Sequence, residues 1–253
     1  MNLIDTHCHL DDAIFDEDRD SILDNCHRLG INKIIIPSTR SMSWDKTISV
    51  SNKYIQTFLT LGLHPIFINK HTEKDIELLN KYVLKYKPIA IGEIGLDYYI
   101  KDTDKKKQLD IFSQQLDIAE QHKLPVVLHV RKSHDDIIKA LQNRSIPGGT
   151  SHAFNGNIEQ AKKYIDLGFK LGFGGTLTYP NARKIHQLAK DLPIESIVLE
   201  TDAPDMSGHN HKGERNSPEY LPEALIALAK IKDTAPENIA EQTTQNACSV
   251  FNI

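Results

Sequence analysis

The stretch IDTHCHLDD, residues 4–12, decides the fold class of this chain. It completes the first predicted strand, Asn2 to Thr6, and the turn that follows holds two histidines but no glycine. An open, doubly wound sheet more often has a glycine-rich turn after its first strand. The start of the sequence therefore favours a closed barrel.

Short β-branched runs alternate with longer segments of helical spacing from this point to the end of the chain. The runs predicted as strands are Asn2 to Thr6, Lys33 to Pro37, Phe58 to Leu63, Ile89 to Ile94, Val126 to Val130, Thr150 to Ala153, Lys170 to Phe173 and Ser196 to Thr201. Thr72 and Asp75 resemble a capping box, and the apolar spacing after them predicts a helix to Tyr86. Eight parallel strands with helical crossovers predict an α/β fold, the (β/α)8 TIM barrel. No repeat or linker divides residues 1–253, so we expect a single domain.

The composition is that of an ordinary globular protein, with 253 residues, 40% of them hydrophobic and 25% charged. A net charge of −4 argues against a protein that coats nucleic acid, but not against an enzyme that meets phosphate through metal ions. No apolar stretch approaches the roughly 20 residues of a membrane span, and the start does not resemble an export signal. The three cysteines have no paired spacing. We therefore expect a cytoplasmic protein without membrane association or an obligate protein partner.

Five of the predicted strands end in histidine, glutamate or aspartate among apolar neighbours. Buried groups of this kind need hydrogen-bonded partners or a metal. In a parallel barrel the carboxyl ends of all strands converge on one face. The residues expected to meet there are His7, His9, Glu93, His129, His152 and Asp202.

Two H-x-H pairs occur, and their surroundings separate them. His7 and His9 leave a strand, whose period of two puts both rings on one face and Cys8 on the other. The first pair can therefore chelate a metal, whereas Cys8 is expected to be a packed core residue. His209 and His211 lie in a loop rich in Gly, Asn and Lys and are expected to be solvated.

Two further residues each have two interpretations. His64, in the GLHP segment, ends the third strand and could be a metal ligand, or it could form a hydrogen bond or contact the substrate. Glu200 lies two residues before Asp202. It could fix the tautomer of a metal-binding histidine, or it could form a structural hydrogen bond inside the barrel.

Seven motifs follow one another along the chain: IDTHCHLD, GLHP, GEIGLDY, LHVRK, SHAFNG, ETDAP and RNSP. In their order and approximate spacing the chain resembles the TatD-related metal-dependent deoxyribonucleases, within the amidohydrolase-like group of barrel hydrolases. The resemblance covers the whole length. Asp205 and Met206 stand where many relatives have an aromatic or apolar pair, so the chain is more similar to a side branch whose natural substrates are less settled.

The resemblance implies that His7, His9 and Asp202 hold one divalent ion, that His129 and His152 hold a second, and that Glu93 bridges or supports both. The mixed donor set suits Zn, Mn or Ni by affinity, whereas the resemblance implies Mg or Mn in turnover. Asp202 is the candidate general base, with Glu93 as the second choice.

Candidate substrate contacts surround this centre, with His64 at its edge. Arg131 follows His129 by two residues, so it could bind a backbone phosphate or form a salt bridge at the rim. Arg215 and Asn216, in the long loop after the eighth strand, could clamp the end of a nucleic-acid strand. Three aromatic residues near strand ends could stack on bases or belong to the core: Tyr98, Phe154 and Tyr179.

The favoured function is a metal-dependent deoxyribonuclease that acts on single strands or 3′ ends of DNA. The alternative is an amide or ester hydrolase, because a metal-activated hydroxide also attacks carbon. A metal-stabilised binding module fits less well, since structural metal sites are closed by four protein ligands.

Overall fold

The structure of the protein is a computed structural model that describes all 253 residues. Its strands are β1 (Leu3–Asp5), β2 (Ile31–Pro37), β3 (Thr57–Leu61), β4 (Ala90–Asp97), β5 (Val126–Arg131), β6 (Gly149–Ser151), β7 (Phe169–Phe173) and β8 (Ile197–Leu199). They form one sheet in sequence order, and every neighbouring pair is parallel. The backbone N–H and the hydroxyl of Thr6 both donate to the carbonyl of Leu199, which joins β1 to β8. The predicted TIM barrel is confirmed.

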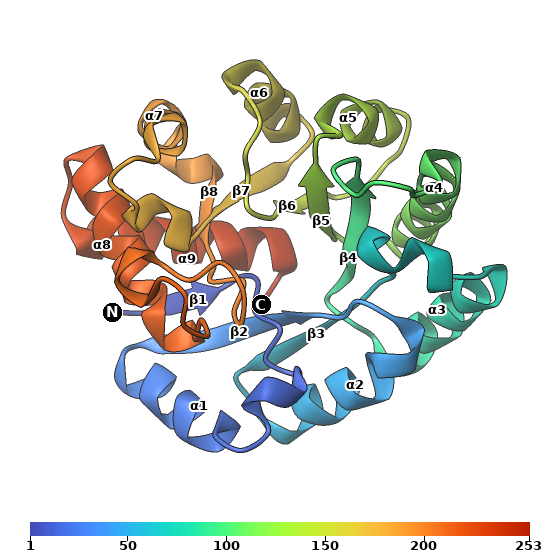
Figure 1. Cartoon of the computed structure of the whole chain (residues 1–253), viewed down its shortest axis with the longest axis horizontal. Coiled ribbons are helices and arrows are strands. Elements are labelled where there is room, and N and C mark those ends of the chain that lie inside the picture. Colours follow the sequence, from blue (N-terminus) through green and yellow to red (C-terminus); the bar gives the residue numbers. More distant parts are fainter.

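Helices surround the strands on the outside, as Figure 1 shows. They are α1 (Arg19–Arg28), α2 (Trp44–Lys53), α3 (Glu73–Tyr86), α4 (Lys105–His122), α5 (His134–Gln142), α6 (Ile158–Asp166), α7 (Arg183–Asp191), α8 (Leu221–Lys232) and α9 (Pro236–Phe251). The predicted capping box is present, because Thr72 caps α3 and its N–H donates to Asp75 at 2.8 Å. One helix follows each strand, and α9 is additional.

Six strands end at residues other than those predicted, and the differences at β4 and β8 concern the polar residues at the strand ends. β4 continues beyond Ile94 to Asp97, and all eight of its residues are buried. β8 ends at Leu199, so Glu200 and Asp202 lie beyond the strand rather than on one of its faces. Asp202 has a φ of 58°, a left-handed conformation that aspartate tolerates better than most residues.

The additional helix α9 covers the amino end of the barrel. It contacts β1, β6, β7 and β8, and the chain ends near the middle of the ring in Figure 1. Phe251 packs against Ile35, Ala90 and Val127, which come from β2, β4 and β5. The carboxyl end of the barrel is therefore the open end.

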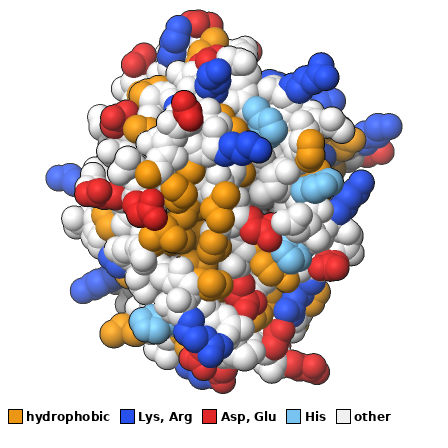
Figure 2. All heavy atoms as spheres, turned by 90° about the vertical axis from the view of Figure 1, so that its left-hand side faces the viewer, with side chains coloured by type: hydrophobic (Ala, Val, Ile, Leu, Met, Phe, Trp, Pro, Cys, Tyr) orange, Lys and Arg blue, Asp and Glu red, His pale blue; other side chains and the backbone are white.

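The helix α8 has apolar residues on both its inner and outer faces. Leu225 and Leu228 are fully buried, whereas Ile226 is 59% exposed. Figure 2 shows the side of the molecule on which α8 lies, where hydrophobic side chains gather among charged ones. No helix of the structure is both long and apolar enough to cross a membrane.

Candidate metal centre

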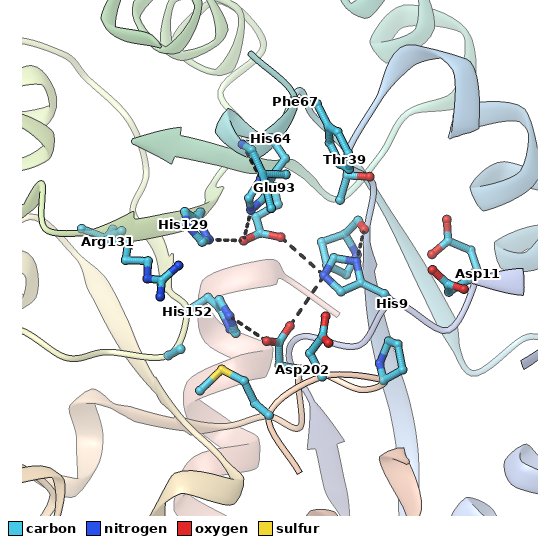
Figure 3. A pocket seen from close by; sticks show the side chains of 18 of the residues that line it. His9, Asp11, Thr39, His64, Phe67, Glu93, His129, Arg131, His152 and Asp202 are labelled. Carbon is cyan, nitrogen blue, oxygen red and sulfur yellow. Dashed lines mark hydrogen bonds and ion pairs between the residues drawn. The ribbon is translucent and has the colours of Figure 1, made fainter. Parts of the chain in front are cut away.

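The six predicted donor side chains meet at the carboxyl end of the barrel. Five of them line a pocket of about 800 Å³: His9, Glu93, His129, His152 and Asp202. The sixth, His7, lies directly beneath, with its ring stacked 3.8 Å from that of His152. Figure 3 shows the five donors that line the pocket, which come from β4, β5 and the segments after β1, β6 and β8, pointing toward a shared space.

One group of donors comes from the segments that follow β1 and β8. The Nε2 atoms of His7 and His9 each lie 3.6 Å from Oδ1 of Asp202. Backbone hydrogen bonds hold the two segments together: Asp202 N–H donates to His7 O, and His9 N–H to Ala203 O, both at 2.8 Å. The Nδ1 atom of His9 lies 3.1 Å from the carbonyl of Pro37, to which it donates. Its Nε2 lone pair is therefore directed into the site.

Glu93 on β4 stands at the centre of the cluster. Its Oε2 lies 3.2 Å from His7 Nε2, and its Oε1 lies 3.0 Å from His129 Nδ1. Gly95 allows this geometry, because its φ is 147° and a Cβ there would collide with the carbonyl oxygen of His129. The close approach of β4 and β5 thus brings Glu93 between the two groups of histidines.

Asp97 is a site residue that the sequence analysis missed. Its Oδ2 lies 3.2 Å from His129 Nε2, and the side chain is 2% exposed. A carboxylate at Nε2 keeps a proton on that nitrogen and leaves Nδ1 to face the site. The alternation of buried and exposed positions could not reveal Asp97, since every residue of β4 is buried.

Both interpretations of Glu200 find support, because its carboxylate lies beside His152 and also forms a structural hydrogen bond to the backbone. Its Oε1 lies 2.8 Å from His152 Nδ1, an ion-pair contact without hydrogen-bond alignment, and also accepts from the N–H of Ala153 at 2.6 Å. A Cβ on Gly172 would overlap the Glu200 carboxylate, so the glycine leaves room for it inside the barrel. The Glu200 carboxylate beside Nδ1 favours a proton on that nitrogen, and Nε2 faces Asp202 Oδ2 at 3.5 Å.

His64 acts as a hydrogen-bond donor rather than a ligand in this arrangement. Its Nδ1 accepts from the N–H of Ile66 at 3.0 Å, and burial lowers its pKa to about 4, so the ring is neutral. The remaining proton is on Nε2, which lies 3.1 Å from Glu93 Oε1. Although His64, Glu93 and His129 have ligand atoms within 4.8 Å of one another, this tautomer excludes His64 from coordination.

The charges of the cluster fit a cation site. Burial would raise the pKa of Asp202, but neighbouring imidazoles, His152 foremost, outweigh it and lower the pKa to about 2. Burial would also raise the pKa of Glu93, yet His64 and His7 hold it well below its usual range. Both carboxylates are therefore ionised at neutral pH.

The histidines of the metal-free protein differ in charge. Burial lowers the pKa of His7, so that ring is neutral. Burial acts in the same direction on His129 and His152, but their carboxylate neighbours outweigh it. The pKa of His129 is raised to about 8, and that of His152 is raised well above its usual range. Without a metal, the protons on His129 and His152 supply the positive charge beside the carboxylates.

The buried ring of His7 indicates whether the donor cluster suits a metal ion. Neither of its nitrogens has a hydrogen-bond partner, although the residue is fully buried. An unsatisfied buried nitrogen is costly unless something else binds it. Two overlapping groups place His7 with further donors within 4.8 Å: His7, Glu93 and His152, and His7, His9 and Asp202. Imidazole nitrogens and carboxylate oxygens in this number fit a divalent transition metal.

The structure brings only two of the four predicted substrate contacts to the pocket, His64 and Arg131. Arg215 instead pairs with Asp18 at 2.6 Å and covers the ring of Phe15. Asn216 is 2% exposed, and its amide donates to the carbonyls of Thr201 and Asp205. The part of the loop that carries Arg215 and Asn216 thus folds back on the start of α1 and on the loop itself, whereas Pro204, Asp205 and Met206, earlier in the loop, line the pocket.

Several minor expectations have different outcomes. Cys8 is fully buried in the hydrophobic core, as predicted. Phe154 lines the pocket but is 2% exposed and belongs to the hydrophobic core, whereas Tyr98 donates to Asp136 and Tyr179 donates to the carbonyl of Ser207. The expectation that His211 is solvated is wrong, because its ring stacks 3.6 Å from that of Tyr220.

Comparison with known proteins agrees with this site. The family described as "TatD related DNase" matches residues 4–252. The chain is 37% identical to an uncharacterized metal-dependent hydrolase of Haemophilus influenzae, with all of both chains covered. It is 35% identical to the uncharacterized metal-dependent hydrolase YjjV of Escherichia coli K12, over 99% of this chain and 98% of YjjV. The crystal structure of YjjV matches the fold with a TM-score of 0.95 at 34% identity, again over 99% and 98% of the two chains.

Proposed function

This chain belongs to the TatD family of metal-dependent hydrolases, and we propose that it hydrolyses phosphodiester bonds of DNA, with single strands or 3′ ends as substrates. One observation carries the proposal: the donor cluster forms the floor of a pocket whose wall presents Arg40, Lys46 and Arg131. These cations line the pocket of a chain whose net charge is −4. Guanidinium and ammonium groups beside a metal centre suit a phosphate substrate, although Asp11, Asp12 and Asp205 also line the pocket.

We assign the donors to two ions on either side of Glu93, as the resemblance to the family implies. His7, His9 and Asp202 would hold one divalent ion, and His129 and His152 would hold the other, with Glu93 between them. Two such ions, whether Mg, Mn or Zn, would supply Lewis acidity toward a phosphoryl oxygen and an activated water.

Asp202 is the better candidate for the general base. Its side chain is 14% exposed, whereas that of Glu93 is 2% exposed, so Asp202 is the carboxylate that the pocket reaches. Asp202 is ionised at neutral pH, so it could accept a proton from a water that bound metal ions had acidified. Glu93, buried and contacted by four histidines, would lie between the two ions and hold them in place.

The rim beside the pocket suits a single strand. Tyr99 is 53% exposed, and the guanidinium of Arg131 lies 3.8 Å from the centre of its ring. The ammonium of Lys132 lies 4.8 Å from the same ring. An exposed aromatic ring among cations can bind both a base and its phosphate. The mouth of a barrel also admits a strand end more easily than a duplex.

The test is hydrolysis of labelled single-stranded DNA by the Mn²⁺-loaded protein, together with its metal content. Asp202→Asn should lower activity by about 10³-fold, the scale on which loss of transition-state stabilisation acts, and His129→Ala should also lose metal. Asp136→Asn is the matched control, because this carboxylate at the same end of the barrel bonds Tyr98 and does not line the pocket.

Two results would count against this proposal. Full activity and metal content in both site variants would show that the site is misassigned. Turnover of amide or ester substrates by a protein that leaves DNA intact would instead identify an amide or ester hydrolase.

A further inference from the structure

Arg40 differs from the other cations that line the pocket, because no carboxylate or hydrogen-bond acceptor of the chain binds it. Lys46 pairs with Asp16 at 2.9 Å, and Arg131 lies 3.9 Å from Asp97. The guanidinium of Arg40 forms no ion pair and donates no hydrogen bond within the chain, and its Nε is buried and unsatisfied. A buried donor without an acceptor is unfavourable unless a ligand satisfies it.

The segment that carries Arg40 is held in place by its backbone. The carbonyl of Thr39 accepts from the N–H of His64 at 2.9 Å, and the carbonyl of Arg40 accepts from that of Ser43 at 3.0 Å. The guanidinium lies 4.4 Å from the centre of the Phe67 ring. Stacking on an aromatic face leaves the N–H edge of a guanidinium free to bind an oxyanion. Arg40 is therefore an ordered donor rather than a mobile surface side chain.

Arg40 lies beside the metal centre and not within it. The ring of Phe67 is 6.4 Å from that of His64, which in turn contacts Glu93. Thr39 and Phe67 are near His64 in Figure 3, and Arg131 is on the other side of Glu93 in that view. An anion bound by Arg40 would thus be a different group from the one held by the donor cluster.

We propose that Arg40, stacked on Phe67, forms a subsite for a second phosphate of the substrate, one that flanks the phosphate at the donor cluster. The planar fork of a guanidinium matches two phosphate oxygens, and a nucleic-acid strand supplies such a phosphate at the next nucleotide. The inference rests on the proposed phosphodiesterase function. It makes Arg40 a residue that favours substrates with two adjacent phosphates over those with one.

The test compares ligands that differ by a single phosphate. Calorimetric titration of the Mn²⁺-loaded protein with thymidine 3′,5′-bisphosphate should give roughly 10- to 100-fold tighter binding than with either thymidine monophosphate. Arg40→Gln should lose most of this gain, and Arg40→Lys, which keeps the charge without the fork, should keep part of it. Lys70→Gln is the matched control, because Lys70 is exposed near the same Phe67 ring and does not line the pocket.

The outcomes separate this inference from the proposed function. If the parent shows no gain from the second phosphate, or if Arg40→Gln keeps all of it, Arg40 serves only to pack against Phe67 and the subsite is wrong. If the gain depends on Arg40 but no DNA is hydrolysed, the subsite is supported and the phosphodiesterase function fails. If DNA is hydrolysed without any gain, only the subsite fails.

Discussion

At the amino end of the barrel, the buried amide of Asn246 donates to the carbonyls of Ile194 and Ile197 at 2.8 and 2.7 Å. At the carboxyl end, the equally buried ring of His7 has no hydrogen-bond partner. At the amino end, the hydroxyl of Thr244 resembles Asn246 in this respect, because it donates to the carbonyl of Asn2. Polar groups of α9 therefore complete the backbone bonding at the amino ends of the strands.

The two ends of the barrel therefore have different roles. The amino end stabilises the fold, and the carboxyl end holds the chemically reactive side chains. At the amino end, the buried polar groups Thr244 and Asn246 of α9 are paired with backbone carbonyls, and Phe251 covers the apolar residues. The carboxyl end gathers ionised carboxylates and imidazoles whose mutual contacts leave nitrogen atoms free. Such a cluster is unfavourable by itself, and a bound cation would compensate for it. Substitutions at the two ends should therefore affect different measurements.

The largest effect on folding is expected at the amino end. Phe251→Ala removes a 3% exposed ring that packs against three strands, so the free energy of unfolding should fall by roughly 3 to 5 kcal/mol. Denaturant titration measures this change, and Ile226→Ala on the exposed face of α8 is the control. The folded fraction should retain the metal content of the parent. Loss of metal from the folded Phe251→Ala protein would show that the two ends of the barrel do not act independently.

Glu200→Gln should have an intermediate effect, on metal binding. It removes the charge beside His152 Nδ1 and should weaken Mn²⁺ affinity by about 10- to 100-fold, measured by competition with a chelator. Glu195→Gln, on the exposed turn before β8, should bind as the parent does. Equal affinities of the parent and Glu200→Gln would assign Glu200 a purely structural bond to Ala153.

The smallest effect is a pH dependence of metal affinity. The pKa of His129 in the metal-free protein is about 8, so below this pH a metal must displace a proton from the ring. Affinity should rise by about tenfold per pH unit for each displaced proton, and the contribution of His129 should level off above pH 8. Asp97→Asn removes a group that raises this pKa, so its plateau should begin at lower pH. Affinity that stays constant from pH 6 to 8 would contradict the assigned charges.

The sequence was sufficient to predict the barrel and the convergence of the donors. Eight β-branched runs are easily recognised, and parallel strands must bring their carboxyl ends to one face. Asp97 was not predictable in the same way, because a strand buried along its whole length has no alternation to interpret. The role of His64 depends on the N–H of Ile66, a contact that only the folded backbone defines.

The loops were the least predictable part. Arg215 and Asn216 have residue types suited to phosphate, yet a carboxylate and two carbonyls bind them. Arg40 looks like an ordinary loop arginine in the sequence, and its lack of a partner becomes visible only in three dimensions. Which polar side chains remain free for a ligand is decided by long-range packing, and local sequence contains little information about it.

The location of bound metal tests the central claim most directly. Crystals of the protein grown with Mn²⁺ should show two anomalous peaks beside Glu93, one at His7, His9 and Asp202 and the other at His129 and His152. Peaks elsewhere on the surface, or none at these side chains in protein that contains Mn²⁺, would contradict the account.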